Sequence, residues 1–183
     1  GGPSSGECSR GSLVVDGLRS AHPPERSLAG HDDAKERYGP FNLLVGDGEA
    51  VWWRSNRAGS APKRLEPGVH GLSNCLLDTP WPKVAGGRVA MEAVLALRGE
   101  ELVAALLEVL ADRSRPPDGM LPDTGVGLEL ERLLAPRFIV GPVYGTRSST
   151  VVTLSRSGEL RLSERTFAAG GDRGRERDAG GLF

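Results

Sequence analysis

Two stretches of short apolar runs predict β-hairpins, one in each half of the chain. Residues 41–45 and 50–55 flank the turn Gly46-Asp47-Gly48, and apolar runs around an Asp-Gly turn are typical of a hairpin. Residues 147–154 and 159–167 repeat this arrangement around a polar turn that ends in glycine. The pattern therefore predicts two antiparallel pairs of strands, separated by about ninety residues of different character.

A helical periodicity fills part of the sequence between the two hairpins. The clearest case is residues 100–111, where apolar side chains recur every three or four positions and so share one face of a helix. A second helix is expected over residues 82–97, because Pro82 suits the first turn, where an N–H would have no intrahelical partner. The apolar face of the first of these helices consists of Leu102, Val103, Leu106, Leu107 and Leu110.

Weaker patterns predict further elements and one unstructured segment. Residues 168–183 are mostly Gly, Asp, Arg and Glu without hydrophobic anchors, so we expect a disordered tail there. The other expected helices are residues 12–18, 25–38 (interrupted by Gly30) and 127–134, and the other expected strands are residues 63–65 and 68–73.

The order hairpin, helices, hairpin indicates the fold class. It favours an α+β domain with antiparallel sheets over a Rossmann-type parallel sheet, which would alternate strands and helices. The length of 183 residues suffices for one domain with a buried core. We therefore expect a single domain over residues 1–167, followed by the disordered tail 168–183.

Composition narrows the classes of function. The net charge of −1 provides no field of one sign, so nucleic acid is not an expected partner. No apolar run approaches the roughly 20 residues that span a bilayer. Two cysteines make no disulfide framework, which favours a reducing, cytoplasmic location. The chain begins with Gly1 and its only methionines are Met91 and Met120, so we expect it to be a fragment.

Residues able to bind metal or attack a substrate are few. The histidines and cysteines are scattered and show no zinc-binding spacing, so no metal site is expected. Cys75 has two interpretations, a nucleophile activated by a nearby base or a small buried hydrophobic side chain. Cys8 lies in a segment of small polar residues and is interpreted as incidental.

Four polar or aromatic positions are candidates for a binding or catalytic site. Trp52 and Trp53 could stack on a planar ligand, but adjacent strand residues point to opposite faces, so one is expected in the core. Asn74 and Arg147 are each expected beside a strand end. An Asn amide can donate to an oxyanion and an Arg can hold a carboxylate or thiolate, whereas the alternative interpretation is a turn residue and a structural ion pair.

Taken together, several motifs resemble the NRDE family, also called the transport and Golgi organisation protein 2 family. The resemblance covers residues 9–167, and its motifs occur in the family's order. They are Ser9-Arg10-Gly11, Tyr38-x-x-Phe41-Asn42-Leu43-Leu44, Gly71-Leu72-Ser73-Asn74, Leu77-Asp78-Thr79-Pro80-Trp81-Pro82-Lys83, Leu121-Pro122-Asp123-Thr124, Tyr144-Gly145-Thr146-Arg147-Ser148-Ser149-Thr150 and Glu164-Arg165.

The resemblance implies a fold and a site. The family looks like the N-terminal-nucleophile (Ntn) hydrolases, with a four-layer αββα arrangement of antiparallel sheets. Its members begin Met-Cys and carry Asn-Arg-Asp-Glu soon after, and this chain has neither, so it is expected to be incomplete at its N-terminus. By a more distant likeness to choloylglycine and penicillin V acylases, Asn74 would polarise an amide carbonyl. Arg147 would lie beside it at the mouth of the sheet sandwich, near the nucleophile.

Three hypotheses for function follow. The family's links to haem and lipid metabolism imply a cytosolic protein that handles haem or another hydrophobic metabolite, with Trp52, Trp53, His70 and Trp81 meeting a planar ligand. Alternatively, the parent protein is an Ntn-type hydrolase of linear amide C–N bonds, and this fragment is inactive because its nucleophile is absent. A third possibility is a binding or scaffold module without a site. The sequence does not determine the oligomeric state.

Overall fold

The structure is a computed structural model that describes residues 8–30, 37–59 and 61–182. Contacts divide the chain into two compact units, each of which is described by itself. Unit 1 comprises Gly1–Gly68 and Asn74–Leu77, and unit 2 comprises Val69–Ser73 and Asp78–Phe183. The chain therefore leaves unit 2 for four residues and then returns to it, and the single domain expected over residues 1–167 corresponds to parts of both units.

The described part of unit 1 includes two helices and a three-stranded antiparallel sheet in the order β1-β2-β3. The first hairpin is confirmed, with Leu44 opposite Trp53 in its register. Its turn closes because a carboxylate oxygen of Asp47 accepts hydrogen bonds from the backbone N–H groups of Glu49 and Ala50, both at 3.1 Å. The elements are α1 (Arg10–Arg19), α2 (Pro24–Ala29), β1 (Asn42–Gly46), β2 (Val51–Ser55) and β3 (Lys63–Arg64).

In the hydrophobic core of unit 1, a side chain of helix α1 packs against residues that precede β1. Leu13 of α1 packs with Tyr38 and Phe41, and the two aromatic rings meet edge to face at 6.2 Å. Leu28 of α2 is fully buried. A buried arginine, Arg54 of β2, donates from its guanidinium to the backbone oxygen of Leu28 at 2.6 Å, so the sheet binds the C-terminal turn of α2.

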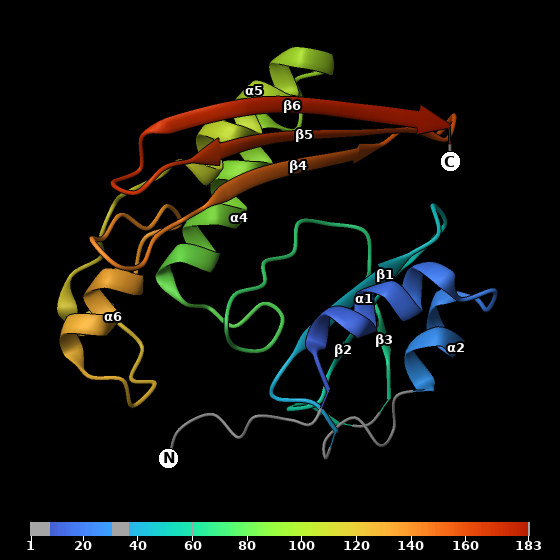
Figure 1. Cartoon of the computed structure of the whole chain (residues 1–183), viewed down its shortest axis with the longest axis horizontal. Coiled ribbons are helices and arrows are strands. Elements are labelled where there is room, and N and C mark those ends of the chain that lie inside the picture. Colours follow the sequence, from blue (N-terminus) through green and yellow to red (C-terminus); the bar gives the residue numbers. More distant parts are fainter. Residues whose placement is uncertain (1–7, 31–36, 60, 183) are drawn as a thin grey trace. The chain divides into compact units, whose positions relative to one another are not determined.

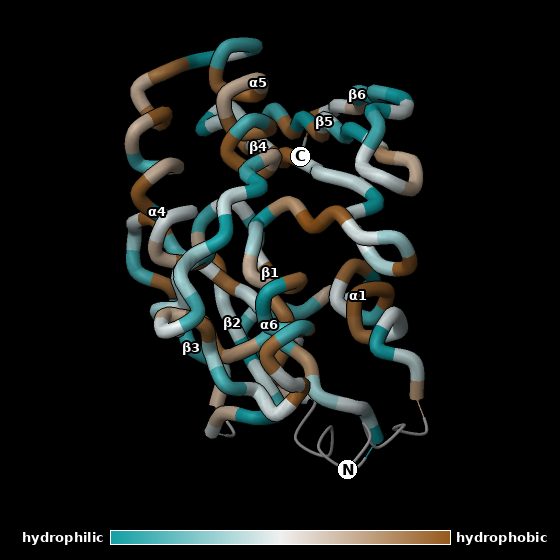
Figure 2. The backbone as a smooth tube through the Cα atoms, turned by 90° about the vertical axis from the view of Figure 1, so that its left-hand side faces the viewer, coloured by the Kyte–Doolittle hydropathy of each residue, from teal (hydrophilic) through white to brown (hydrophobic). Residues whose placement is uncertain are grey.

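Unit 2 contains a second three-stranded antiparallel sheet, in the order β4-β5-β6, with helices on one face (Figure 1). The amphipathic helix is confirmed, because Val103 and Leu107 are buried against Val151 of the sheet. Figure 2 shows hydrophobic positions recurring between hydrophilic ones along α4 and α5. The elements are α4 (Pro82–Val94), α5 (Gly99–Leu110), the 3-10 helix η1 (Asp118–Met120), α6 (Leu128–Leu134), β4 (Ser148–Leu154), β5 (Glu159–Phe167) and β6 (Arg173–Leu182).

The strand β6 differs from the disordered tail expected at residues 168–183. Its residues are all exposed, yet they pair with β5 along the whole strand. Polar contacts take the place of hydrophobic anchors: Arg165 donates to Glu176 at 2.6 Å, and the Ser163 hydroxyl donates to Asp178. A pattern that counts apolar positions cannot detect a strand held by its hydrogen-bond ladder and by cross-strand polar pairs.

The prediction of a strand over residues 68–73 is wrong, because the chain there forms bends and irregular backbone. A backbone hydrogen bond from Asp78 to Gly71, with N···O 2.8 Å, closes a loop instead. The α+β class is confirmed, with two antiparallel sheets and flanking helices among the described residues. Within those same residues, no helix is both long enough and apolar enough to cross a bilayer.

Candidate functional site

The imidazole of His70 is held by the carboxylate of Asp78. The distance between Nδ1 of His70 and Oδ2 of Asp78 is 2.7 Å, and the second carboxylate oxygen accepts from the Gly71 amide at 2.8 Å. Both side chains are about 30% exposed, at 28% and 30%. The pair therefore forms a fixed, partly solvent-accessible imidazole–carboxylate unit within unit 2.

The conformation and charge of Asp78 both suit this role. Its φ angle is 56°, in the left-handed region that Asp and Asn adopt more readily than other non-glycine residues. Partial burial raises the pKa of Asp78, but hydrogen bonds from His70 and Gly71 and the nearby charge of Arg88 outweigh it. The pKa therefore lies below its usual range and the carboxylate is ionised at neutral pH.

Helix α4 packs against the loop that carries His70 and Asp78. Nε of Arg88 donates to the backbone oxygen of Val69 at 2.9 Å, and its NH1 lies 3.7 Å from Asp78. The same helix packs so closely on the loop that a Cβ added at Gly71 would lie 2.6 Å from Cγ1 of Val84. Glycine at this position thus lets the chain pass directly against the first turn of α4.

The tryptophans separate into different environments, as the strand geometry predicts. Trp53 is buried, and its indole N–H donates to the side-chain oxygen of Asn42 at 3.1 Å, whereas Trp52 is half-buried. Trp81 belongs to unit 2, where it precedes α4 and its ring lies 6.0 Å from the ammonium of Lys83. Of the four expected ligand-binding residues, His70 and Trp81 therefore share one unit, and Trp52 and Trp53 share the other.

Asn74 and Arg147 belong to different units, so their predicted proximity stays a prediction. In unit 1, the backbone oxygen of Asn74 accepts from Arg57 at 2.8 Å, and the next residue is bound through its carbonyl by Asn42 at 2.9 Å. The Asn74 side chain is exposed and makes no hydrogen bond within the described part of the chain. The backbone of Asn74 is thus held in place, while its side-chain amide is exposed to solvent.

Arg147 directly precedes β4, as expected, and lines a pocket of about 300 Å³ in unit 2. Its backbone oxygen accepts from the Phe167 amide at 2.9 Å, which anchors the residue to the sheet. Its guanidinium is exposed and has no hydrogen bond or ion pair with any described residue. The sequence alone gave no sign of this pocket, whose walls are residues 139–147 and 168–171.

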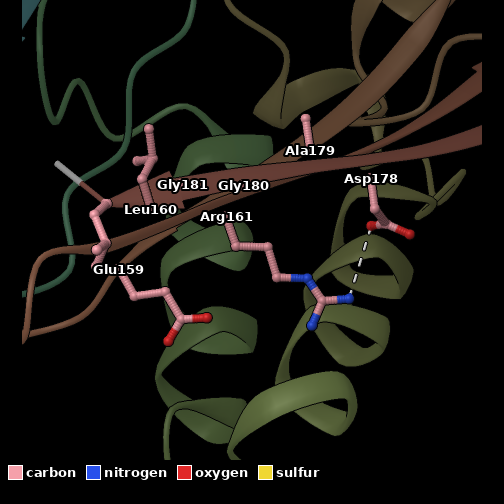
Figure 3. A pocket seen from close by; sticks show the side chains of 8 residues that line it. Glu159, Leu160, Arg161, Asp178, Ala179, Gly180 and Gly181 are labelled. Carbon is pink, nitrogen blue, oxygen red and sulfur yellow. Dashed lines mark ion pairs between the residues drawn. The ribbon is translucent and has the colours of Figure 1, made fainter.

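A second hollow lies over the ends of β5 and β6, with a volume of about 570 Å³ (Figure 3). Its arginine, Arg161, is already engaged, because it pairs with Glu100 at 2.6 Å and with Asp178 at 3.8 Å. Those contacts raise the pKa of Arg161, chiefly through the hydrogen bond to Glu100. The arginine of this hollow is therefore paired with carboxylates, whereas Arg147 has no such pair among the described residues.

The described contacts of the cysteines involve both sulfur and backbone, and a guanidinium nitrogen of Arg37 donates to Sγ of Cys8 at 3.9 Å. Cys8 is half-buried against the Leu13 cluster, and its amide donates to the backbone oxygen of Arg37 at 3.0 Å. Cys75 is also half-buried, and its carbonyl is the acceptor for Asn42. Across residues 8–30, 37–59 and 61–182, no group of three or more His, Cys, Asp or Glu side chains is placed to hold a metal ion.

Sequence reasoning proposed His70, Trp81 and Arg147 as candidates, and it missed the partners that the structure places around them. Asp78 lies in a motif that was noted for its resemblance only, and Arg88 lies in a helix whose other residues gave no sign of its role. An eight-residue separation between His70 and Asp78 has no characteristic periodicity. Only the closed loop brings the two side chains together.

Comparison with known proteins identifies the family. The model of the family described as Transport and Golgi organisation 2 matches residues 2–169. The Transport and Golgi organization protein 2 homolog of Homo sapiens is 34% identical over 154 residues, covering 77% of this chain and 54% of the human protein. The Bos taurus homolog is 33% identical over 179 residues, which cover 86% of this chain and 62% of that protein. The chain thus spans between half and two thirds of these relatives, and it belongs to the Transport and Golgi organisation 2 family.

Proposed function

We propose that the protein containing this chain handles haem or a related hydrophobic metabolite in the cytoplasm. The pairing of His70 with Asp78 carries this proposal. Imidazoles that ligate metals in proteins commonly give their other ring nitrogen to a carboxylate, which fixes the ring's orientation and raises its basicity. Asp78 supplies such a carboxylate, and its lowered pKa keeps it ionised.

The aromatic and cationic residues just after Asp78 also favour a planar, anionic ligand. Trp81 follows three residues later and is half-buried, so part of its ring is accessible. Lys83 lies 6.0 Å from that ring and donates to the backbone oxygen of Leu134 at 2.7 Å. Desolvation by burial lowers the pKa of Lys83, although the nearby charge of Glu131 opposes the shift. A porphyrin with carboxylate side groups combines the two properties that these residues recognise.

The test is a titration of ferric haem into the protein, followed by the haem absorption band near the visible–ultraviolet boundary. We expect a saturable shift with one haem bound per chain, and a different band position in His70→Ala. His22→Ala is the matched control, because His22 is exposed and, among the described residues, only its backbone N–H forms a hydrogen bond, which it donates to the Ser20 hydroxyl. Absorbance that rises linearly without saturation, or a His70→Ala spectrum identical to that of the wild type, would contradict the proposal.

For the fold, we infer the four-layer αββα arrangement of the Ntn hydrolases. The support is that each unit already combines one antiparallel sheet with helices that pack on it: α1 and α2 contact the strands of unit 1, and α5 contacts β4 in unit 2. Two such halves give four layers when the open faces of their sheets meet. A crystal structure in which the two sheets do not face each other would refute this arrangement.

The alternative function is hydrolysis of a linear amide by an N-terminal cysteine that lies outside this chain. The observation that favours it is the Asn74 side chain, whose amide has no partner among the described residues and whose backbone is fixed by Arg57. In this alternative Asn74 donates to the oxyanion and Arg147 lies beside the nucleophile. The longer protein would then release amine from a panel of linear amides, Asn74→Ala would lower kcat by about a hundredfold or more, and this chain alone would release none.

A further inference from the structure

The pocket at Arg147, hereafter the 139–147 pocket, has walls that are fixed by hydrogen bonds. Ile139 and Thr146 close the neck of the loop through two bonds, from the Ile139 amide to the Thr146 hydroxyl and from the Thr146 amide to the Ile139 carbonyl, both at 2.9 Å. Phe138, only 1% exposed, lies beneath and meets the ring of Phe167 edge to face at 4.6 Å. The loop is therefore held at its base by the sheet and the core of unit 2.

Residues 168–171 form the opposite wall of the pocket and are also held by specific contacts. Arg113 stacks over the ring of Phe138 at 4.9 Å and donates to the backbone oxygen of Gly171 at 3.3 Å. Gly171 has a φ of 82°, and a Cβ there would lie 3.1 Å from Phe138 and 3.0 Å from Val140. A side chain at this position would thus meet the pocket's own wall, and glycine keeps the space open.

The lining of the pocket combines apolar side chains with polar backbone groups and a single charged side chain. Its side chains include Ile139, Val140, Pro142 and Tyr144, and the rest of the wall is small residues and backbone. Of the residues lining it in the described chain, Arg147 alone is charged, and no carboxylate compensates the guanidinium. Apolar side chains beside one unpaired cation, with polar backbone between them, match a ligand that has an apolar body and one negative charge.

We propose that the 139–147 pocket binds a small carboxylate with an apolar body, with Arg147 holding the carboxylate. The planar guanidinium matches a carboxylate through two parallel hydrogen bonds. A single arginine balances one negative charge, so a phosphate monoester, with nearly two, would be left partly uncompensated. This pocket contains none of the residues on which the haem proposal depends, so the two proposals are tested independently.

The experiment uses octanoate as the probe and compares it with 1-octanol and octyl phosphate, which share its chain. Binding to the protein is measured by calorimetry, and the backbone amides of Gly141, Gly145 and Gly171 are followed by NMR. The variants are Arg147→Gln, Arg147→Lys and the pocket-filling Ala169→Trp, with folding checked by circular dichroism. Arg156→Gln is the matched control, because Arg156 is an exposed arginine of the neighbouring β4–β5 turn that lines no described pocket.

We expect saturable octanoate binding that shifts those glycine amides. Arg147→Gln should weaken it by about tenfold or more, because a charge-assisted pair is lost. Arg147→Lys should weaken it less, Ala169→Trp should abolish it, and Arg156→Gln should leave it unchanged. 1-Octanol should bind to the wild type more weakly than octanoate does. Its affinity for Arg147→Gln should equal its affinity for the wild type.

Three results would overturn the proposal. The first is no saturable octanoate binding to the wild-type protein. The second is octanoate binding that Arg147→Gln leaves unchanged. The third is tighter binding of octyl phosphate than of octanoate, which would assign the pocket to phosphate ligands instead. The haem titration reads out a spectrum that depends on His70, so its failure and the failure of octanoate binding are distinguishable.

Discussion

Nδ1 of His70 and Oδ2 of Asp78 lie 2.7 Å apart, across a loop whose ends are joined by a backbone hydrogen bond between Asp78 and Gly71. The same carboxylate accepts from the Gly71 amide through its other oxygen. Asp78 thus closes the loop and orients the imidazole at the same time. Its removal should affect both the stability of unit 2 and any ligand that His70 meets.

We predict that Asp78→Asn lowers the free energy of unfolding at pH 7 by about 1–2 kcal/mol, because charge-assisted hydrogen bonds are lost. Asn tolerates the φ of 56°, so the backbone is retained and the change isolates the charge. Urea denaturation measures the difference. Asp172→Asn is the control, since Asp172 is exposed and its carboxylate has no partner among the described residues.

The effect of Asp78 should depend on pH in a defined direction. Because its pKa is lower in the folded than in the unfolded protein, its stabilisation is present above the unfolded value of about 4 and is lost as the pH falls through the folded value. The difference in unfolding free energy between wild type and Asp78→Asn should therefore shrink below about pH 4. A difference that grows on acidification would contradict this assignment.

We predict that Gly71→Ala destabilises unit 2 by about 1–3 kcal/mol, because its Cβ would lie 2.6 Å from Val84 and force α4 away from the loop. Thermal unfolding provides the measurement. Gly119→Ala should change the melting temperature little, since nothing lies within 4 Å of a Cβ at that position. Equal melting temperatures for Gly71→Ala and Gly119→Ala would show that the loop yields freely.

For unit 1, we predict that Arg54→Met lowers the unfolding free energy by about 2–3 kcal/mol. The buried guanidinium donates to the backbone oxygens of Leu28 and Ala29, and methionine fills the space without binding the end of α2. Faster hydrogen exchange in α2 should accompany the loss. Arg64→Met serves as the control, because Arg64 lies exposed on β3, and it should leave exchange in α2 unchanged.

We predict that Arg165→Met loosens β6. The buried guanidinium joins this strand to helix α5, because it pairs with Glu176 at 2.6 Å and with Glu108 at 3.1 Å. Amides of β6 should then exchange severalfold faster while those of β4 are unaffected. Arg177→Met on the same strand should not reproduce the effect, because Arg177 is exposed and has no ion pair with a described residue. Uniform acceleration in all three strands would indicate general destabilisation instead.

The elements with a local signal can be predicted from the amino-acid order alone. Both hairpins follow from apolar runs around turn residues, and α5 follows from a spacing that places Val103 and Leu107 on one face. The start of α4 follows from Pro82, whose ring fits the first helical turn. These predictions hold because strand and helix periodicities depend on near neighbours in the chain. Together they give the α+β class and place Trp81 before α4 and Arg147 before β4.

Which of those positions share surroundings depends on how the folded chain packs its elements together. The loop that joins His70 to Asp78, the space that requires glycine at position 71 and the pocket beside Arg147 each depend on segments distant in the sequence. The strand β6 is held by a ladder to β5 and by Arg165, so its own composition does not reveal it. Contacts of this kind arise from packing between elements, whose geometry no local pattern of residues encodes.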